Sequence, residues 1–167
     1  KTGTEEYDYI QAYECIGGAA MELVSGGGHD KELWEAANKK YFTKDPLAPC
    51  NAAVIPDAAR SKCYVYMSPH YMELAGANIE VFNMEQLKKG MGYCTALPFG
   101  PDRDACIGGF GKDFVSLVGS HDLRKRDAGV FSDRQMQDVD NLCKQNEDPR
   151  DVHTCEAYAV SMFFWGG

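Results

Sequence analysis

The fold is decided by the stretch FNMEQLKKGMGYCTALPFGPDRDACIGGF, which spans residues 82–110. After its first Phe comes Asn83, a helix-capping residue, and Gln86 stands three positions later. In such a capping box the cap side chain accepts from an orphan helix N–H, and the Gln side chain reaches back to the cap. The stretch therefore predicts a helix with Cys94 near its end, a Pro- and Gly-rich turn, and a second helix with Cys106 near its start.

The same module occurs two more times, at residues 42–47 and 131–136, each time as a Phe, a cap residue, and a Gln or Pro three positions after the cap. A cysteine pair follows every copy. Antiparallel helices joined by a short turn bring such cysteines within the roughly 4.4–6.8 Å Cα separation of a disulfide. Each closed loop of 12 or 13 residues is expected to contribute about 3 kcal/mol of stability. The predicted disulfides are Cys50–Cys63, Cys94–Cys106 and Cys143–Cys155.

Cys15 is the seventh cysteine and has no partner in this scheme. The segment from Cys15 to residue 30 aligns with the segment from Cys106 to residue 122 when one residue is inserted. We therefore expect the N-terminal helix to be the second half of a unit whose first half is missing. Cys15 is expected to be buried, or paired with a cysteine outside this chain or removed from it. A reactive or metal-bound thiol is the alternative.

Paired glycines follow both of these aligned cysteines, as Gly17-Gly18 and Gly108-Gly109. Glycine costs up to roughly 1 kcal/mol in a helix relative to alanine, so the pairs predict close approach between helices. A phosphate-binding loop is the less favoured interpretation, because no strand precedes these glycines and no Gly-Lys-Ser/Thr follows them.

The expected fold is all-α: a short, solenoid-like array of disulfide-stapled helix–turn–helix repeats in one domain. The expected half-unit covers residues 1–30, and three units cover about 31–75, 76–119 and 120–167. A helix from Asp30 to about Phe42 leads into the first full unit, where Pro46 and Pro49 limit the helix before Cys50 to a single turn. The connections at 76–82 and 119–131 are expected to be looser.

This arrangement of stapled helix pairs resembles the tetratricopeptide and Sel1-like class of helical repeats, particularly its secreted, disulfide-containing members. The resemblance covers most of the chain, although the cysteine spacing and the period of about 45 residues depart from the Sel1 consensus. What it implies is a binding surface on stacked helices, with no catalytic centre.

Composition narrows the function further. The net charge of −8 argues against binding to nucleic acid or to an anionic lipid surface. No apolar run approaches the roughly 20 residues of a transmembrane helix. Regularly spaced cysteine pairs indicate an oxidising compartment, so the protein is expected to be secreted or periplasmic, with Lys1 as a mature or trimmed start. Structural zinc is the rival interpretation of the cysteines, but the sequence has no C-x-x-C motif.

Candidate chemistry is sparse. Thioether and imidazole ligands suit copper in an oxidising compartment, although we expect Pro69 to disturb or bend the helix that would carry them. The candidate copper ligands are Met67, His70 and Met72. His29 and His121 each precede an Asp at a predicted helix end, which favours a structural role over metal binding or acid–base chemistry. The paired carboxylates Asp102/Asp104 and Asp148/Asp151 are interpreted as solvated caps.

Three functional hypotheses follow. The leading one is a non-catalytic interaction module or accessory subunit that docks on another protein subunit, or on an upstream segment of the same precursor. Its candidate docking residues lie at the apolar C-terminus: Phe163, Phe164 and Trp165. The second hypothesis is a periplasmic protein that binds copper or another metal, and the third is a small hydrolase that uses His and Asp at the cap positions.

Overall fold

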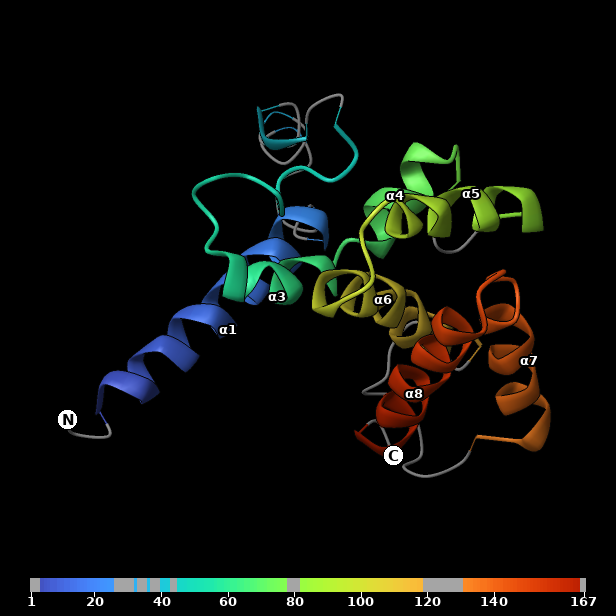
Figure 1. Ribbon diagram of the computed structural model, residues 1–167. Helices are drawn as coiled ribbons and strands as arrows, with labels where there is room; N and C mark the ends of the chain where they lie inside the picture. Colours follow the sequence, from blue (N-terminus) through green and yellow to red (C-terminus); the bar gives the residue numbers. More distant parts are fainter. Residues whose placement is uncertain are drawn as a thin grey trace.

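The computed structural model describes residues 4–25, 32, 36, 40–42, 45–77, 82–118 and 131–165. Within the first of these ranges it describes the side chains of residues 11–24 only, and within the last those of residues 131–164. These residues form an all-α fold with no strand (Figure 1). No helix among them combines the length and apolarity that a membrane span requires. The helices are α1 (Thr4–Ser25), the 3₁₀-helix η2 (Asp57–Ala59), α3 (Arg60–Tyr64), α4 (Ser68–Leu74), α5 (Met84–Thr95), α6 (Pro101–Val118), α7 (Asp133–Cys143) and α8 (Pro149–Trp165).

The two predicted capping boxes are present at the starts of α5 and α7. The Asn83 side-chain oxygen accepts from the backbone N–H of Gln86 at 2.9 Å, and Oε1 of the Gln86 side chain accepts from the backbone N–H of Asn83 at 3.0 Å. Ser132 and Gln135 form the same reciprocal pair. These contacts are local, so the sequence pattern alone specifies both helix starts.

Each capping-box glutamine also fastens its helix to the preceding one. The Gln86 amide donates to the carbonyl of Gly76, just after α4, at 2.8 Å. The Gln135 amide donates to the carbonyl of Val118, the last residue of α6, also at 2.8 Å. One side chain thus both starts a helix and satisfies a carbonyl that the end of the previous helix leaves without an intrahelical donor.

All three predicted disulfides are confirmed. Cys50–Cys63, Cys94–Cys106 and Cys143–Cys155 each join adjacent elements with a Cα–Cα distance of 5.5 Å. All six cysteines are at most 1% exposed. The bonds therefore lie inside the hydrophobic core. Two of them tie the end of one helix to the next helix, and Cys50–Cys63 ties a turn to α3.

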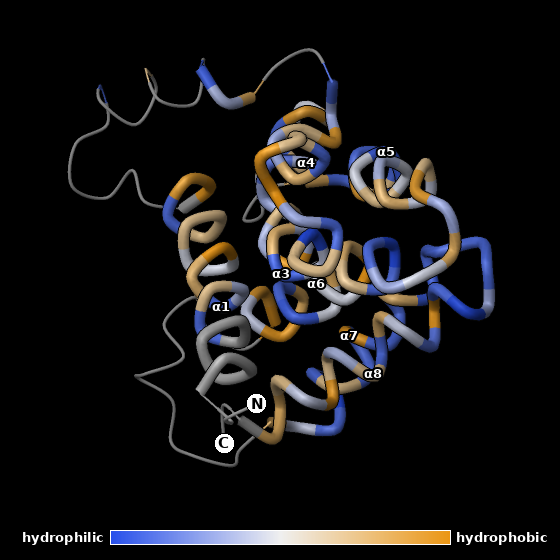
Figure 2. Tube along the Cα trace, turned by 60° about the vertical axis from the view of Figure 1, so that its left-hand side comes forward, coloured by the Kyte–Doolittle hydropathy of each residue, from blue (hydrophilic) through white to orange (hydrophobic). Residues whose placement is uncertain are grey.

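The helices that carry the second cysteine of each pair form a column. α3 packs between α1 and α6, and α8 packs along α6. Figure 1 shows α1, α3 and α6 in succession from left to centre, with α8 beside α6, and Figure 2 shows the same order from another side. α6 is the centre of the core, where Ile107, Phe110 and Val115 are fully buried. α5 packs against α4 and α6, and α7 packs against α6 and α8.

The first cysteine-paired segment differs from the expected helix–turn–helix. Residues 45–50 form turns instead of a single helical turn, and the second helix is divided into α3 and α4. Pro69, which was expected to disturb or bend this helix, lies directly after the break between α3 and α4. It stands at the start of α4, where its missing N–H would have no intrahelical acceptor. Of the expected helix from Asp30 to Phe42, residues 32, 36, 40 and 41 are helical, and most of its other residues lie outside the described part.

Candidate functional site

Neighbouring helices of the column meet at residues that lie a fixed number of sequence positions after their cysteines. Where α1 crosses α3, Gly17 lies two residues after Cys15, and it faces Tyr66, three residues after Cys63. Where α6 crosses α8, Gly108 and Tyr158 occupy the same two positions relative to Cys106 and Cys155. Where α3 crosses α6, the equivalent pair is Val65 and Gly109. In every crossing, the second residue after one cysteine meets the third residue after the next.

One member of each pair is glycine, and the spacing shows why. A Cβ on Gly109 would lie 2.6 Å from the carbonyl oxygen of Val65, and a Cβ on Gly108 would lie 2.5 Å from the Tyr158 ring. A Cβ on Gly111 would overlap the carbonyl oxygen of Cys155. Such distances are far below ordinary van der Waals contact. Gly17, Gly108 and Gly109 therefore permit the close crossings, as the sequence predicted, whereas the prediction is wrong for Gly18, where a Cβ would meet nothing within 4 Å.

The last helix of the column, α8, leaves its equivalent face open. The residues two, five and nine positions after the cysteine are buried in both α1 and α6, and the glycines among them lie against the next helical segment. In α8 the same positions are exposed and apolar: Ala157 is exposed, Val160 is 64% exposed and Phe164 is 79% exposed. The corresponding buried residues are Gly17, Ala20 and Val24 in α1, and Gly108, Gly111 and Val115 in α6.

The first helix, α1, is open on its opposite side. Gly18 is the third residue after Cys15, the position that receives the preceding helix in the other crossings. A Cβ built on Gly18 would meet nothing within 4 Å. Cys15 is an exposed free thiol, whereas the cysteines at the equivalent position in α3, α6 and α8 are buried in disulfides. The expectation that Cys15 would be buried within the chain is therefore wrong.

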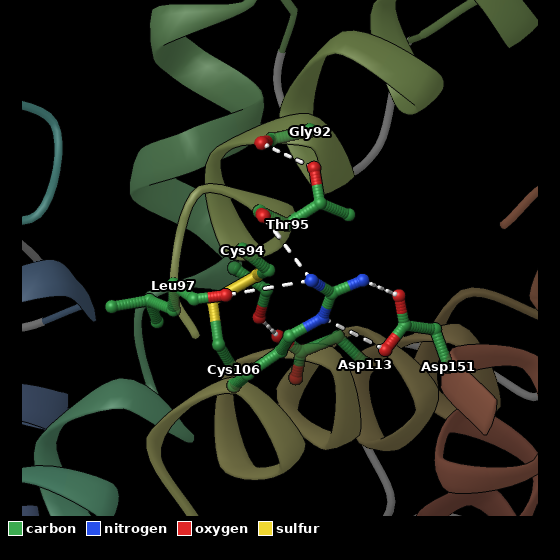
Figure 3. Close-up of a disulfide and its surroundings, with 9 residues drawn as sticks. Gly92, Cys94, Thr95, Leu97, Cys106, Asp113 and Asp151 are labelled. Atoms are coloured by element: carbon green, nitrogen blue, oxygen red, sulfur yellow. Dashed lines mark hydrogen bonds and ion pairs between the residues drawn. A yellow bond between two sulfur atoms is a disulfide. The ribbon is translucent and has the colours of Figure 1, made fainter. Parts of the chain in front are cut away.

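A buried ion pair joins α6 to α8. Arg103 donates to both carboxylate oxygens of Asp151, at 3.1 Å and 2.5 Å, and the Asp151 side chain is 1% exposed. Arg103 also donates to the carbonyl of Thr95, the last residue of α5, and to the carbonyl of Leu97, two residues further on (Figure 3). Hydrogen bonding to Asp151 raises the pKa of Arg103 above its usual value. The interpretation of Asp151 as a solvated cap is thus wrong, because its carboxylate balances a buried guanidinium.

The other paired carboxylates lie nearer the surface. Asp148 does cap α8, since its side chain accepts from the backbone N–H of Arg150 at 2.8 Å. The Arg150 side chain pairs with Asp104 at 3.0 Å. The guanidinium groups of Arg103 and Arg150 both lie over the ring of Phe99, at 4.1 Å and 5.2 Å. These contacts hold the starts of α6 and α8 together around one aromatic ring.

A polar cleft of about 500 Å³ lies beside this ion pair. Its walls come from α5, α6, the turn before α8 and the first turn of α8, and include Lys88, Arg103, Asn146, Glu147 and Asp151. No Ser, Cys or His lines it within the described residues, so it contains none of the usual pairs of nucleophile and base. Arg103 and Asp151 are occupied by each other, so the described part of the cleft has no evident catalytic constellation.

A second buried polar contact joins α4 to α6. The hydroxyl of Ser68 donates to the carboxylate of Asp113, and Lys112 pairs with the same carboxylate at 2.5 Å. Ser68 is fully buried, and Asp113 is 9% exposed. With the serine hidden from solvent, the contact fixes the relative position of the two helices, a structural role that nothing in the sequence pattern had indicated.

The three candidate copper ligands lie at the start and middle of α4. Met67 and Met72 are at most 1% exposed and belong to the hydrophobic core. His70 is 7% exposed, and its ring stacks on Phe42 with centroids 3.8 Å apart. Burial lowers the pKa of His70 to about 4. Copper binding stays a prediction, which elemental analysis of protein purified without chelator tests.

The candidate docking residues divide into three cases. Phe163 is half-buried, and its ring packs edge-on against Phe131 at 4.4 Å. Phe164 is exposed. The side chain of Trp165 lies outside the described residues, as do His29 and His121. Of the described side chains in the predicted aromatic cluster, Phe164 is the one shown to be largely exposed.

Comparison with known proteins identifies no relative: no family model, curated protein or solved structure matches this chain. The resemblance to Sel1-like repeats is therefore confirmed only as far as an all-α fold with three disulfides between adjacent helices.

Proposed function

We propose that the protein is a secreted or periplasmic interaction module, built as a short solenoid-like array of disulfide-stapled helix–turn–helix repeats and acting as an accessory subunit. The observation that carries this proposal is the open face of α8, on which Ala157 and Val160 are exposed. It has the register of two buried faces, yet its side chains are exposed.

Two recurring contacts support the repeat architecture. The column helices cross at the same positions relative to their cysteines in three successive pairs. Gln86 and Gln135 make the same two kinds of contact, one with their own helix cap and one with the carbonyl end of the preceding helix. In repeat proteins each unit contacts only its neighbours, so a terminal unit presents the face that an internal unit would bury.

The chemistry of the open face favours a protein partner. Full burial of a Val or Phe side chain contributes roughly 1.5–3 kcal/mol relative to exposure. Terminal units of soluble repeat arrays normally carry a polar outer face. An apolar stripe in that place indicates a surface that a partner covers.

Cys15 supports docking at the other end of the column. In the three stapled pairs, the cysteine at this position binds a cysteine on the segment packed alongside. A partner subunit, or an upstream segment of the same precursor, that presents a cysteine beside α1 would complete the same arrangement. The three disulfides favour an oxidising compartment.

Affinity capture from a native extract tests the proposal. The baits are the wild-type chain, Val160→Glu on the open face, and Val54→Glu as the matched control. Val54 is 87% exposed in the turn before η2, far from α8 in sequence. We expect the wild type and Val54→Glu to retain the same protein and Val160→Glu to lose it. Equal capture by all three baits, or capture by none, would contradict docking through α8.

A further inference from the structure

We propose that the open face of α8 docks on α1 of a second copy of this chain, so that the helix column continues from one molecule to the next. This inference rests on the proposed function, because it names the partner of the same surface. Within one chain, the second residue after the cysteine of one column helix meets the third residue after the cysteine of the following column helix.

The two ends of the column supply the two halves of one more crossing. The second residue after Cys155 is Ala157, which is exposed on α8. The third residue after Cys15 is Gly18, which has open space around it on α1. Each crossing within the chain joins one glycine to a larger residue, and Ala157 against Gly18 satisfies that rule. The chain thus has one crossing position without a neighbouring helix at each end of the column: Ala157 on α8 and Gly18 on α1.

The neighbouring positions fix how close the two copies come. Gly111, five residues after Cys106, lets α6 approach the backbone of Cys155 very closely. The equivalent residue in α8 is Val160, and in α1 it is Ala20. The crossing between copies is therefore wider than that of α6 with α8 and nearer to that of α1 with α3. It places Val160 of one copy beside Cys15 of the next.

The contact joins two different surfaces, so it is head-to-tail. Such an interface leads to open chains of molecules unless the rotation closes a ring. A single pair of helices falls at or below the roughly 1,200 Å² that marks the lower limit of stable interfaces. The net charge of −8 on every copy also opposes association at low salt. We therefore expect a weak assembly that strengthens with ionic strength and is best detected by covalent trapping.

Trapping uses the native thiol of Cys15 and a Val160→Cys substitution. Oxidised glutathione is the oxidant: the two thiols lose two protons and two electrons and form one disulfide, and the glutathione disulfide is reduced to two thiols. The controls are the wild type, Val54→Cys with a second thiol away from the interface, and Val160→Cys with Cys15→Ser. A parallel sample receives a short bis-maleimide reagent, which bridges thiols without requiring disulfide geometry.

We expect Val160→Cys to give a ladder of dimers, trimers and larger species, with a peptide that links residue 160 to residue 15. The wild type, with one thiol per chain, stops at dimers, and the variant with Cys15→Ser gives no ladder. The inference is overturned if Val160→Cys forms no more ladder than Val54→Cys with either reagent. If, in addition, capture of a different protein is lost in Val160→Glu, the proposed function stands with another partner. If all capture baits behave alike, the proposed function fails as well.

Discussion

Tyr158 of α8 lies directly over Gly108 of α6, so close that a Cβ at position 108 would come within 2.5 Å of the tyrosine ring. Tyr66 and Gly17 repeat the relationship between α3 and α1 at 3.2 Å. Both pairs occupy the same positions relative to a cysteine. A disulfide and a glycine contact therefore recur together along the column. The first and last helices each have one crossing position that no neighbouring helix fills.

Gly111→Ala is predicted to destabilise the fold. Its new methyl group would overlap the carbonyl oxygen of Cys155, which is backbone and cannot rotate away as a side chain can. Overpacking of this kind costs about 1–3 kcal/mol. Urea denaturation measures the loss. The control is Gly92→Ala in α5, where a Cβ meets nothing within 4 Å. This substitution is expected to increase stability by up to about 1 kcal/mol, because Ala has the higher helix propensity. Equal effects of the two substitutions would refute the close crossing of α6 and α8.

Asp151→Ala is predicted to be among the most destabilising substitutions on α8. It leaves the guanidinium of Arg103 buried without its carboxylate, and removal of one partner from a buried pair costs about 3–5 kcal/mol. Asp140→Ala is the matched control, because Asp140 forms an exposed i,i+4 pair with Lys144 in α7, worth about 0.5 kcal/mol or less. Chemical denaturation of both variants gives the comparison, and a cost below 1 kcal/mol for Asp151→Ala would show that the pair is not a buried staple.

Stability is predicted to fall as the pH decreases from about 6.5 towards 4. Burial holds the pKa of His70 at about 4 in the folded state, against about 6.5 in the unfolded chain. Between these values the unfolded state binds more protons, so protonation favours unfolding, and the stabilisation present above pH 6.5 is lost. The shift corresponds to a loss of roughly 3 kcal/mol by pH 4.

The control for this pH dependence is His70→Phe, which keeps an aromatic ring against Phe42 but does not titrate. Denaturation curves between pH 7.5 and 4.5 should show a shallower decline for the variant than for the wild type. Identical slopes would mean that His70 is solvated in the folded protein, contrary to its 7% exposure.

The thiol inventory provides a further prediction. The unreduced monomer should take up one alkyl group, on Cys15, and the reduced monomer should take up seven. Intact mass spectrometry counts both. Three alkylated thiols before reduction would mean that one of the disulfides is absent, and none would mean that Cys15 is already bound to another thiol.

The sequence predicted those features that depend on short spacing. The capping boxes at Asn83 and Ser132 involve residues three positions apart, and each disulfide joins positions 12 or 13 apart. Such contacts form within one helix start or one hairpin, where the chain has few alternatives. The patterns therefore carry the information directly.

The sequence did not reveal contacts that depend on how separate units pack. Arg103 and Asp151 are 48 positions apart, and Asp151 in the first turn of a helix has the pattern of an ordinary cap. The sequence indicated Phe164 as a candidate docking residue but missed Ala157 and Val160, since those two look like part of any helical stripe. A signal was nevertheless present: residues two, five and nine positions after Cys15, Cys106 and Cys155 are all small or apolar.

The central claim is that the open face of α8 is an interface in the native protein. Hydroxyl-radical footprinting with mass spectrometry tests it most directly, by comparing the isolated monomer with the assembly recovered from its natural source. Met84 on α5, which is 48% exposed, is the internal reference. We predict that Val160 and Phe164 are strongly modified in the monomer and protected in the assembly, while Met84 is modified equally in both. Equal modification of Val160 in the two samples would contradict the claim, whatever the partner.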